Sequence, residues 1–469
     1  MIRTEHALGP DSTRQPAPPP GRTAVIASVA SAFPERAYSQ EEIGTLLGLE
    51  NRVVKKLLRS PHIQRRHLYL PEKDPGTGRA RSESAADLHA KFRAGTREIG
   101  SRAILEALDS ASLSPSEVDY MLCVTSSGFM VPGLSSLFSR ELGFNRNLLR
   151  ADVVGMGCNA GLNGMNPLVQ WVRNHPGGVA LLVCCEVNSA IYVLDDSPRT
   201  GIVNSLFGDG AAAAVLTGSD GQGPSPRTPS VVDFESFCVP EQWAAMRFDW
   251  NADAGKWSFY IDRDIPYVIG FNIREPVEAL LKRNGLDFSA VKHWVLHTGG
   301  GAVIDSVKLN LGLTEHDVRH TRSVLHDYGN ISSGSFLVSL QRLLAEGRTS
   351  AGDIGVMVTM GPGAQIETAL LEFGPSGKES PCPKPLLLVQ TAVRHTRVLP
   401  SRKASPSGSW MVAPMTSPSG CAFTPEARCG SGRPRVAISA RSCTRTTGSQ
   451  PGSGAFSRSM RSRNSPERP

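Results

Sequence analysis

The chain has 469 residues, of which 40% are hydrophobic and 20% charged, and its formal net charge is +7 at pH 7. This length exceeds a single compact core and predicts two packed halves. The longest apolar run, 179–185, is too short to cross a bilayer, and the proline-rich amino terminus lacks a signal-peptide pattern. We therefore expect a cytoplasmic protein. Nine irregularly spaced cysteines argue against a disulfide framework and a zinc ribbon.

The positive charge is concentrated at the carboxyl end. Residues 376–469 hold 15 Lys/Arg and 3 Asp/Glu, a net charge of +12, which leaves −5 for the rest of the chain. A body of this charge gives no reason to expect nucleic acid as a partner. Both a functional basic tail and the product of a frameshift stay open as explanations. We predict four parts: a disordered arm (1–22), an N-terminal half (23–225), a C-terminal half (226–374) and a disordered basic tail (375–469).

The first regular elements follow the arm directly. A β-rich segment covers 24–33, and a helix with an acidic first turn begins near Ser39. The apolar runs at 118–127 and 178–187 predict strands that are covered on both faces of a sheet. Because strands alternate with helical stretches, we expect an α/β fold with a parallel or mixed sheet.

Two pairs of segments indicate an internal duplication. Residues 207–218 and 360–373 each combine a glycine turn with a strand. Upstream of them lie two helix starts rich in Gly, Asn or Ser, at 155–164 and 327–336. The pattern predicts two similar stacked α/β halves with a site between them.

Three residues on glycine-rich turns are candidates for chemistry. Cys158 lies at a helix start, where unpaired N–H groups and the helix dipole favour a thiolate, although a buried structural cysteine is the alternative. His297 ends an apolar strand before a glycine turn, a common place for sites in α/β folds. His293 is interpreted as a core histidine, since no third ligand supports a metal site. Asn330 follows Gly329 in a turn that is expected to start another helix, so helix capping is its alternative role.

Together these side chains fit one chemistry. The thiolate of Cys158 takes an acyl group from a thioester, while the imidazole of His297 stabilises that thiolate. His297 and Asn330 can then donate hydrogen bonds to the thioester oxygen that gains enolate charge when malonyl-CoA loses CO2. This chemistry requires neither a metal nor a redox cofactor.

From Thr23 to Phe373 the motifs resemble those of the chalcone-synthase-like, or type III, polyketide synthases. The resemblance implies a thiolase-like fold of two stacked α/β halves in αβαβα layers and a homodimer. It also implies an acyltransferase that condenses malonyl-CoA units by decarboxylative Claisen condensation and cyclises them. The contexts of Cys158, His297 and Asn330 correspond to the catalytic triad of that family.

The resemblance assigns further roles. LFGDGAAAAV and WSFYIDRDIPYVI are similar to gatekeeper segments, which implies that Phe207 and Phe259 hold the decarboxylating unit. Val131 stands where plant enzymes have a methionine that reaches into the partner subunit. Other implied substrate-binding positions are Glu186, Asn188, Ile191, Gly361, Pro362 and Gly363.

Basic residues on the segment 50–70 are similar to those that bind the phosphates of CoA in the family. Lys56 matches best, followed by Arg59, and both share a helix face with Arg52. A solvated helix face is the alternative for Arg52 and Arg59, and Lys55 carries the weakest match.

The segments GMGCNAGLN, VNSLFGDG, DVRHT and DYGNISSGSF resemble bacterial members of secondary metabolism more than plant members. That resemblance implies condensation of four malonyl-CoA units to 3,5-dihydroxyphenylacetyl-CoA, with hydratase-like proteins assisting later dehydration. Two alternatives stay open. One is a condensing enzyme like ketoacyl-acyl-carrier-protein synthase III, and the other is a basic-tailed binding or scaffold protein.

Overall fold

A computed structural model of the chain describes residues 23–218 and 227–374, and all of these belong to one folded unit. The predicted arm (1–22) and basic tail (375–469) lie outside the described residues. The predicted boundary between the halves, at 225/226, also falls within a segment, 219–226, that is not described. None of the helices in the described ranges is both long and apolar enough to cross a membrane.

The N-terminal half forms a mixed sheet in the order β5-β4-β6-β7-β1. Strand β4 runs parallel to β5 and β6, whereas β7 is antiparallel to both β6 and β1. Continuous apolar sequence explains why β6 is buried along its whole length. The strands are β1 (Ala24–Ala32), β4 (Tyr120–Thr125), β5 (Leu149–Val154), β6 (Val179–Glu186) and β7 (Gly210–Gly218).

The C-terminal half repeats this arrangement with four strands in the order β11-β12-β13-β8. The pair β11 and β12 is parallel, and β13 is antiparallel to both of its neighbours. Short pairing of Ala24 with Val231 and of Val25 with Ser230 joins β1 to β8, so the two sheets share one nine-stranded ladder. The strands are β8 (Ser230–Cys238), β11 (Val291–Leu296), β12 (Ile354–Gly361) and β13 (Gln365–Glu372).

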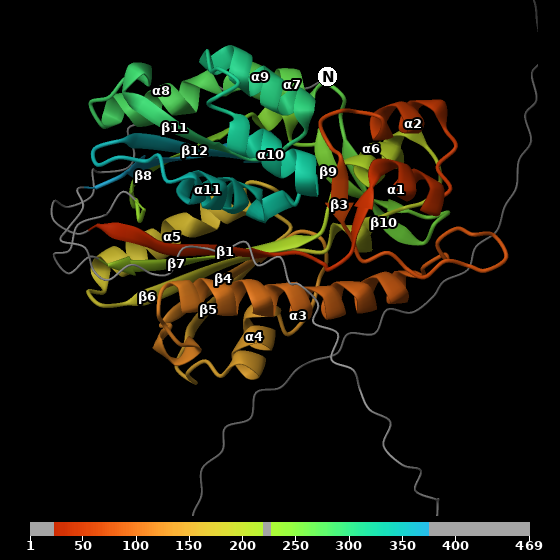
Figure 1. Cartoon of the computed structure of the whole chain (residues 1–469), viewed down its shortest axis with the longest axis horizontal. Coiled ribbons are helices and arrows are strands. Elements are labelled where there is room, and N and C mark those ends of the chain that lie inside the picture. Colours follow the sequence, from red (N-terminus) through yellow and green to blue (C-terminus); the bar gives the residue numbers. More distant parts are fainter. Residues whose placement is uncertain (1–22, 219–226, 375–469) are drawn as a thin grey trace, which may run out of the picture. The chain divides into compact units, whose positions relative to one another are not determined.

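Helices separate and cover the sheets, which gives the predicted αβαβα layers (Figure 1). The central helices α5 (Ala160–Asn174) and α11 (Ser335–Glu346) contact strands of both halves. Helix α3 (Ala85–Ser110) packs on β1, β6 and β7, with α4 (Leu134–Leu142) beside it. Helix α8 (Arg274–Arg283) packs on β8 and β13, near α7 (Ile265–Asn272), α9 (Gly301–Leu311) and α10 (Arg319–Tyr328).

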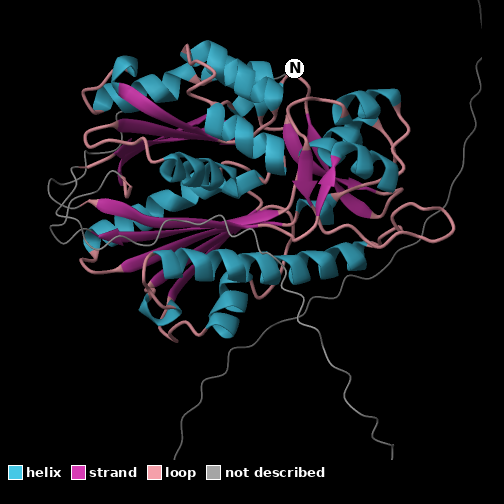
Figure 2. Cartoon of the chain, viewed as in Figure 1, coloured by secondary structure: helices cyan, strands magenta, loops and turns pink. Residues whose placement is uncertain are grey.

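Smaller elements gather at one end of the two sheets, where the chain turns between layers (Figure 2). They include two short antiparallel ribbons, β2 with β3 and β9 with β10. The elements at this end are β2 (Ala37–Ser39), β3 (Arg65–His67), β9 (Met246–Asn251), β10 (Lys256–Ile261), α1 (Gln40–Leu46), α2 (Arg52–Leu58) and α6 (Pro198–Leu206). The described residues also form the 3₁₀ turns η1 (Pro115–Glu117), η2 (Asn188–Ile191), η3 (Pro240–Gln242), η4 (Phe288–Ala290) and η5 (Ser332–Gly334).

Most predicted elements are confirmed. Ser39 caps α1 in a reciprocal capping box with Glu42, as the acidic first turn indicated. The helix start expected at 327–336 is confirmed at Ser335, but the same segment also contains a helix end. Gly329 closes α10 with a positive φ of 70°, and α11 begins only at Ser335. A glycine marks a helix end as readily as a start, so the sequence could not separate the two.

Close packing of the central helices brings the two halves together. A Cβ added at Gly161 of α5 would lie 2.3 Å from the backbone oxygen of Ser333, just before α11. A Cβ at Gly164, one turn later, would instead meet the end of the Leu122 side chain at 2.9 Å. Of these two glycines, only Gly161 therefore faces a backbone atom, which cannot shift on its own as a side-chain end can.

We predict that Gly161→Ala lowers the free energy of unfolding by about 1–3 kcal/mol, because overpacking against backbone outweighs the helix propensity that alanine gains. Urea unfolding of the purified variant measures this loss. Gly164→Ala on the same helix is the matched control, because its side-chain neighbour can shift. Equal stability of the two variants would contradict the proposed backbone contact.

Candidate active site

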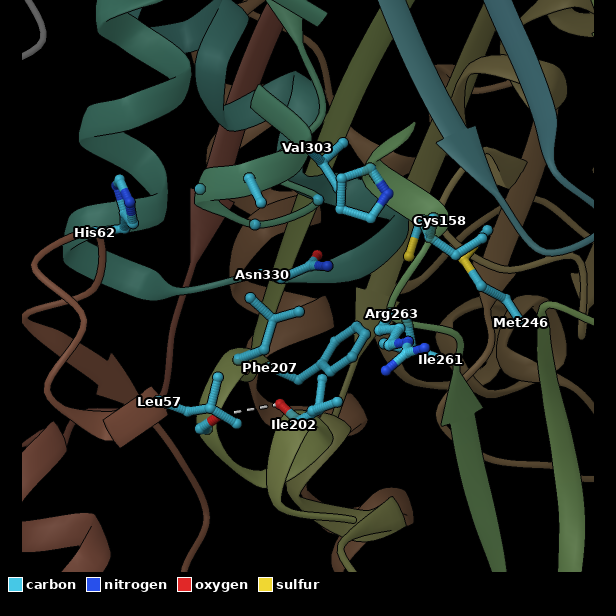
Figure 3. A pocket seen from close by; sticks show the side chains of 18 of the residues that line it. Leu57, His62, Cys158, Ile202, Phe207, Met246, Ile261, Arg263, Val303 and Asn330 are labelled. Atoms are coloured by element: carbon cyan, nitrogen blue, oxygen red, sulfur yellow. Dashed lines mark hydrogen bonds between the residues drawn. The ribbon is translucent and has the colours of Figure 1, made fainter. Parts of the chain in front are cut away.

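The three candidate catalytic residues line one cavity of about 420 Å³. Cys158 lies between β5 and α5, and His297 directly follows β11. Asn330 lies between α10 and α11. Figure 3 shows Cys158, Asn330 and Phe207 around this cavity. One residue therefore comes from the first half and two from the second.

Backbone pairing fixes Asn330 against the first half. Its N–H donates to the Leu206 oxygen at 2.9 Å, and its carbonyl accepts from the Gly208 N–H at 3.0 Å. Its side-chain Oδ1 accepts from the Ser332 N–H at 2.8 Å within the turn, but Asn330 caps none of the described helices, since the N-cap of α11 is Gly334. The turn bond occupies the oxygen, which leaves the amide nitrogen as the donor for chemistry.

Burial changes the electrostatics of the predicted nucleophile. The pKa of Cys158 is raised to about 12, chiefly because the thiol is buried, and the Glu186 carboxylate raises it further. Hydrogen bonds from Ser332, whose Oγ lies 3.4 Å from Sγ, and from Asn330 act in the opposite direction. In this structure the thiolate expected at a helix start is not the favoured form, because desolvation outweighs the local donors.

The pKa of His297 is shifted in the opposite direction. Burial lowers the pKa of its imidazole to about 3, and a hydrogen bond with the Ser332 backbone only partly opposes this. Its Nδ1 lies 2.5 Å from Ser335 Oγ. The free site therefore holds a neutral thiol beside a neutral imidazole.

A second cavity of about 360 Å³ begins at the same cysteine. The two cavities share Cys158, Phe207, Met246 and Phe259 in their linings. The rings of Phe207 and Phe259 meet edge to face, with centroids 5.9 Å apart. These predicted gatekeepers thus stand at the junction of the two spaces.

Several predicted pocket residues line the second cavity, namely Asn188, Ile191, Pro362 and Gly363. Gly361 lines neither cavity and packs against the nucleophile turn instead. A Cβ there would lie 2.2 Å from Asn159 Oδ1, and a Cβ at Gly157 would lie 2.2 Å from Pro362 Cδ. The glycine–proline loop is therefore held against the turn that carries Cys158.

Glu186 lies behind the site and lines neither of the two cavities. Its fully buried carboxylate accepts from the backbone N–H groups of Ser126 and Ser127 at 2.9 and 3.1 Å. It also accepts from the hydroxyls of Ser127 at 2.8 Å and Ser333 at 2.6 Å. Burial raises the pKa of this carboxyl group. Glu186 ties the loop after β4 to the turn before α11.

The predicted CoA-binding side chains lie outside both cavities. Lys56 and Arg59 are exposed, as are Arg52 and Lys55, and Lys55 pairs with Glu50 at 2.5 Å. Their segment nevertheless borders the first cavity through Leu57, Ser60 and His62. Arg263, a largely exposed cation that sequence reasoning missed, lines that cavity from the opposite segment (Figure 3).

A buried arginine holds the backbone of the predicted gatekeeper Phe207. Arg66 is fully buried and donates to the Phe207 carbonyl at 2.6 Å and to the Tyr192 hydroxyl at 2.8 Å. Tyr192 donates to the same carbonyl at 2.6 Å. Sequence reasoning missed Arg66 because it lies in a basic run that resembles a solvated surface.

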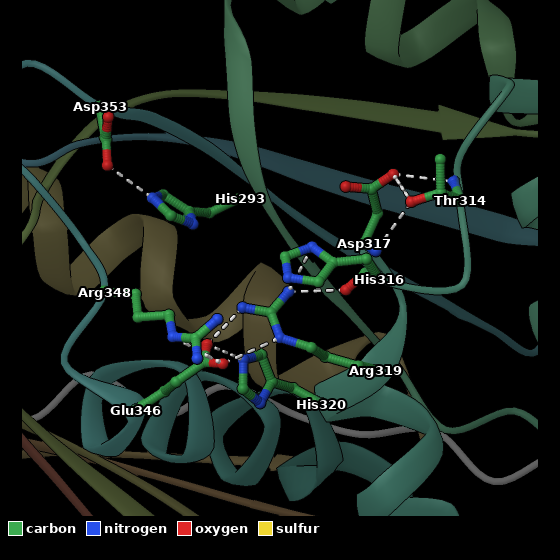
Figure 4. Close-up of polar contacts among 9 residues, drawn as sticks. All are labelled: His293, Thr314, His316, Asp317, Arg319, His320, Glu346, Arg348 and Asp353. Atoms are coloured by element: carbon green, nitrogen blue, oxygen red, sulfur yellow. Dashed lines mark hydrogen bonds and ion pairs between the residues drawn. The ribbon is translucent and has the colours of Figure 1, made fainter.

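His293 lies apart from the catalytic side chains. Its Nε2 is 2.7 Å from the Asp353 carboxylate (Figure 4). Its ring also meets Phe373 edge to face. A neighbouring cluster joins His320 and Arg319 to Glu346. Within residues 23–218 and 227–374, no three His, Cys, Asp or Glu side chains gather as metal ligands.

The chain matches two family descriptions that together cover most of the described residues. Chalcone and stilbene synthases, N-terminal domain, matches 21–221, and chalcone and stilbene synthases, C-terminal domain, matches 244–373. The chain is 46% identical over 369 residues to 3,5-dihydroxyphenylacetyl-CoA synthase of Streptomyces toyocaensis, covering 78% of this chain and 93% of that protein. It is 28% identical over 356 residues to 1,3,6,8-tetrahydroxynaphthalene synthase of Streptomyces peucetius subsp. caesius, covering 74% and 93%.

Solved structures share the fold. Polyketide synthase PKS-I of the brown alga Ectocarpus siliculosus superposes with a TM-score of 0.69 at 24% identity, covering 75% of this chain and 98% of that one. The 1,3,6,8-tetrahydroxynaphthalene synthase of Streptomyces coelicolor A3(2) gives 0.66 at 25% identity, covering 75% and 100%.

The lowered pKa of His297 predicts a pH dependence of stability. An unfolded histidine binds a proton below about pH 6.5, whereas the folded site resists protonation until about pH 3. The stability that arises from this pKa difference is therefore fully present above about pH 6.5. It is lost as the pH falls toward about 3, the pKa in the folded site.

Replacing His297 with Gln removes this titration. Between pH 7 and pH 5, we expect the stability of His297→Gln to improve relative to wild type by about 2 kcal/mol. Urea unfolding of both proteins at the two pH values measures the difference, with the exposed His175→Gln as control. An identical pH dependence of wild type and His297→Gln would contradict the buried neutral imidazole.

Proposed function

The chain belongs to the chalcone and stilbene synthases, the type III polyketide synthases, and from this premise we propose that it condenses malonyl-CoA units and cyclises them to 3,5-dihydroxyphenylacetyl-CoA. The observation that carries the proposal is the convergence of Cys158, His297 and Asn330 on one cavity. As a family member the protein is a condensing acyltransferase, which replaces the ketoacyl-acyl-carrier-protein synthase alternative.

Acyl loading is the first step. The thiol of Cys158 attacks the thioester carbonyl of the starter and transfers its proton to His297, and the CoA thiolate leaves with a proton returned by that ring. The opposite pKa shifts of the two residues mean that no ion pair exists beforehand. The free thiol is then protected by burial until substrate arrives.

Chain extension follows on the same side chains. The amide nitrogen of Asn330 and a ring N–H of His297 donate to the thioester oxygen of a second malonyl-CoA. Loss of CO2 leaves enolate charge on that oxygen, where fixed donors in a dry site stabilise it most. The carbanion attacks the acyl group on Cys158, the thiolate leaves, and a β-ketoacyl-CoA forms.

The product assignment rests on two supports. Identity is 46% to two 3,5-dihydroxyphenylacetyl-CoA synthases but 28% to a tetrahydroxynaphthalene synthase. The second cavity is also small, about 360 Å³, and Ile191 and Phe248 narrow it. A short chain that closes a single aromatic ring suits this space better than a longer one.

Three further parts of the proposal concern partners. Lys56 and Arg59 bind the phosphates of CoA near the entrance formed by Leu57 and His62. Two copies of the chain form a homodimer, and hydratase-like proteins assist the later dehydration. Glu186 supports substrate binding indirectly, through the loop and turn that it connects.

We predict that purified protein with malonyl-CoA alone yields a 3,5-dihydroxyphenylacetyl product, detected by mass spectrometry. Cys158→Ala should abolish it, and Asn330→Ala should lower kcat by about 10²–10³-fold through loss of one oxyanion donor. Cys123→Ala is the matched control, because this cysteine is equally buried and lines neither cavity. A different polyketide would refute the product, and turnover independent of Cys158 would refute the mechanism.

The basic-tailed binding alternative predicts a different outcome on truncation. The last described strand, β13, ends at Glu372, and all residues that line the two cavities precede that residue. Removing 375–469 should therefore leave malonyl-CoA turnover unchanged. A steady-state assay of the truncated and full chains compares them, and loss of turnover with the fold intact by circular dichroism would contradict this.

A further inference from the structure

Ser335, the first residue of α11, contacts the catalytic imidazole from behind. It is fully buried, and its Oγ lies 2.5 Å from Nδ1 of His297. The same Oγ accepts a hydrogen bond from the Thr298 backbone N–H at 3.3 Å.

The partners of the Ser335 hydroxyl indicate that it is the donor in its hydrogen bond with His297. A backbone N–H can only donate, so Thr298 occupies a lone pair of Ser335 Oγ. The hydroxyl has one proton, and within the described chain Nδ1 of His297 is the acceptor that lies within hydrogen-bond distance of it. Donation to Nδ1 satisfies both groups, whereas the reverse direction leaves the hydroxyl proton without a partner in a buried site.

We propose that Ser335 is a positioning residue that holds His297 in the tautomer with its proton on Nε2. The ring nitrogen that Ser335 does not occupy then carries the N–H, which donates to the Ser332 backbone in the free site and to a substrate oxygen in the cavity shared with Cys158 and Asn330. The inference rests on the proposed function, because a neutral N–H donor is what the developing enolate oxygen requires.

A hydroxyl suits this position better than a carboxylate would. A carboxylate can only accept, so it would fix the proton on Nδ1 and turn Nε2 into an acceptor. The chain contains a histidine–carboxylate pair elsewhere, in which Asp353 lies 2.7 Å from Nε2 of His293 and so favours the proton on that nitrogen (Figure 4). Ser335 can donate to the neutral ring and accept from the protonated ring, so it supports both states of the cycle.

The backbone around Ser335 keeps this contact fixed. Its carbonyl accepts from the Ser339 hydroxyl at 3.1 Å, one turn along α11. The preceding turn is tied to Glu186 through Ser333 at 2.6 Å. Ser335 therefore meets His297 as part of a rigid helix start.

The test uses the full-length protein and three variants. Ser335→Ala should lower kcat for malonyl-CoA condensation by about 10- to 100-fold, as expected for loss of one buried hydrogen bond. It should also move the acid limb of the kcat profile to higher pH, because the neutral ring loses the donor that stabilises it. Ser335→Cys should recover part of both effects. Ser28→Ala is the matched control, since its buried hydroxyl donates to the Ala107 carbonyl and lines neither cavity.

A measurement without substrate separates this inference from the proposed function. Nitrogen-15 NMR of histidine-labelled protein, with His297 assigned through His297→Gln, should report a protonated Nε2 and an unprotonated Nδ1. Ser335→Ala should lose this pattern. A protonated Nδ1 in wild type, or an unchanged pH profile in Ser335→Ala, would overturn the inference. Absence of malonyl-CoA turnover in wild type would refute the proposed function, while the NMR result still decides the role of Ser335.

Discussion

Close backbone contact between the two halves is the constraint on which the site depends. Gly161 allows α5 to approach the Ser333 carbonyl, and the pairing of Leu206 and Gly208 with Asn330 closes the same junction. The nucleophile comes from one half, and its two partners come from the other. The chemistry therefore exists only where the halves meet at backbone distance, and small residues at this junction are a requirement of catalysis as much as of packing.

Burial at this junction also sets the resting chemistry. Desolvation moves the pKa of Cys158 up and that of His297 down, so neither group is charged in the free site. Neutral serine hydroxyls supply most of the surrounding contacts, from Ser332 on the thiol to Ser335 on the imidazole. A hydroxyl can donate or accept, which suits groups whose protonation changes during turnover.

The sequence predicts the parts of this protein that are governed by local patterns. Apolar runs located β4 and β6, and glycine-rich turns located Cys158, His297 and Asn330. The supporting residues Glu186, Arg66 and Ser335 act through contacts between segments far apart in the chain, so no local pattern gives their roles. Ser335 lies in the segment DYGNISSGSF, yet its contact with His297 depends on the packing of α11 beside β11. The raised pKa of Cys158 was missed for the same reason, because burial is a tertiary property.

The support of Phe207 has a consequence for how such enzymes diversify. Its carbonyl is held by Arg66 and Tyr192, and its neighbours pair with the backbone of Asn330. An inherited change that moves the backbone of Phe207 also moves a catalytic amide, so the backbone at this gatekeeper cannot shift alone. Ile191 and Phe248 line the second cavity from other segments and take no part in this backbone pairing. Changes in the size of the product ring are therefore expected to arise on the Ile191 and Phe248 side of the second cavity. Side chains can be exchanged there while the catalytic backbone stays in place.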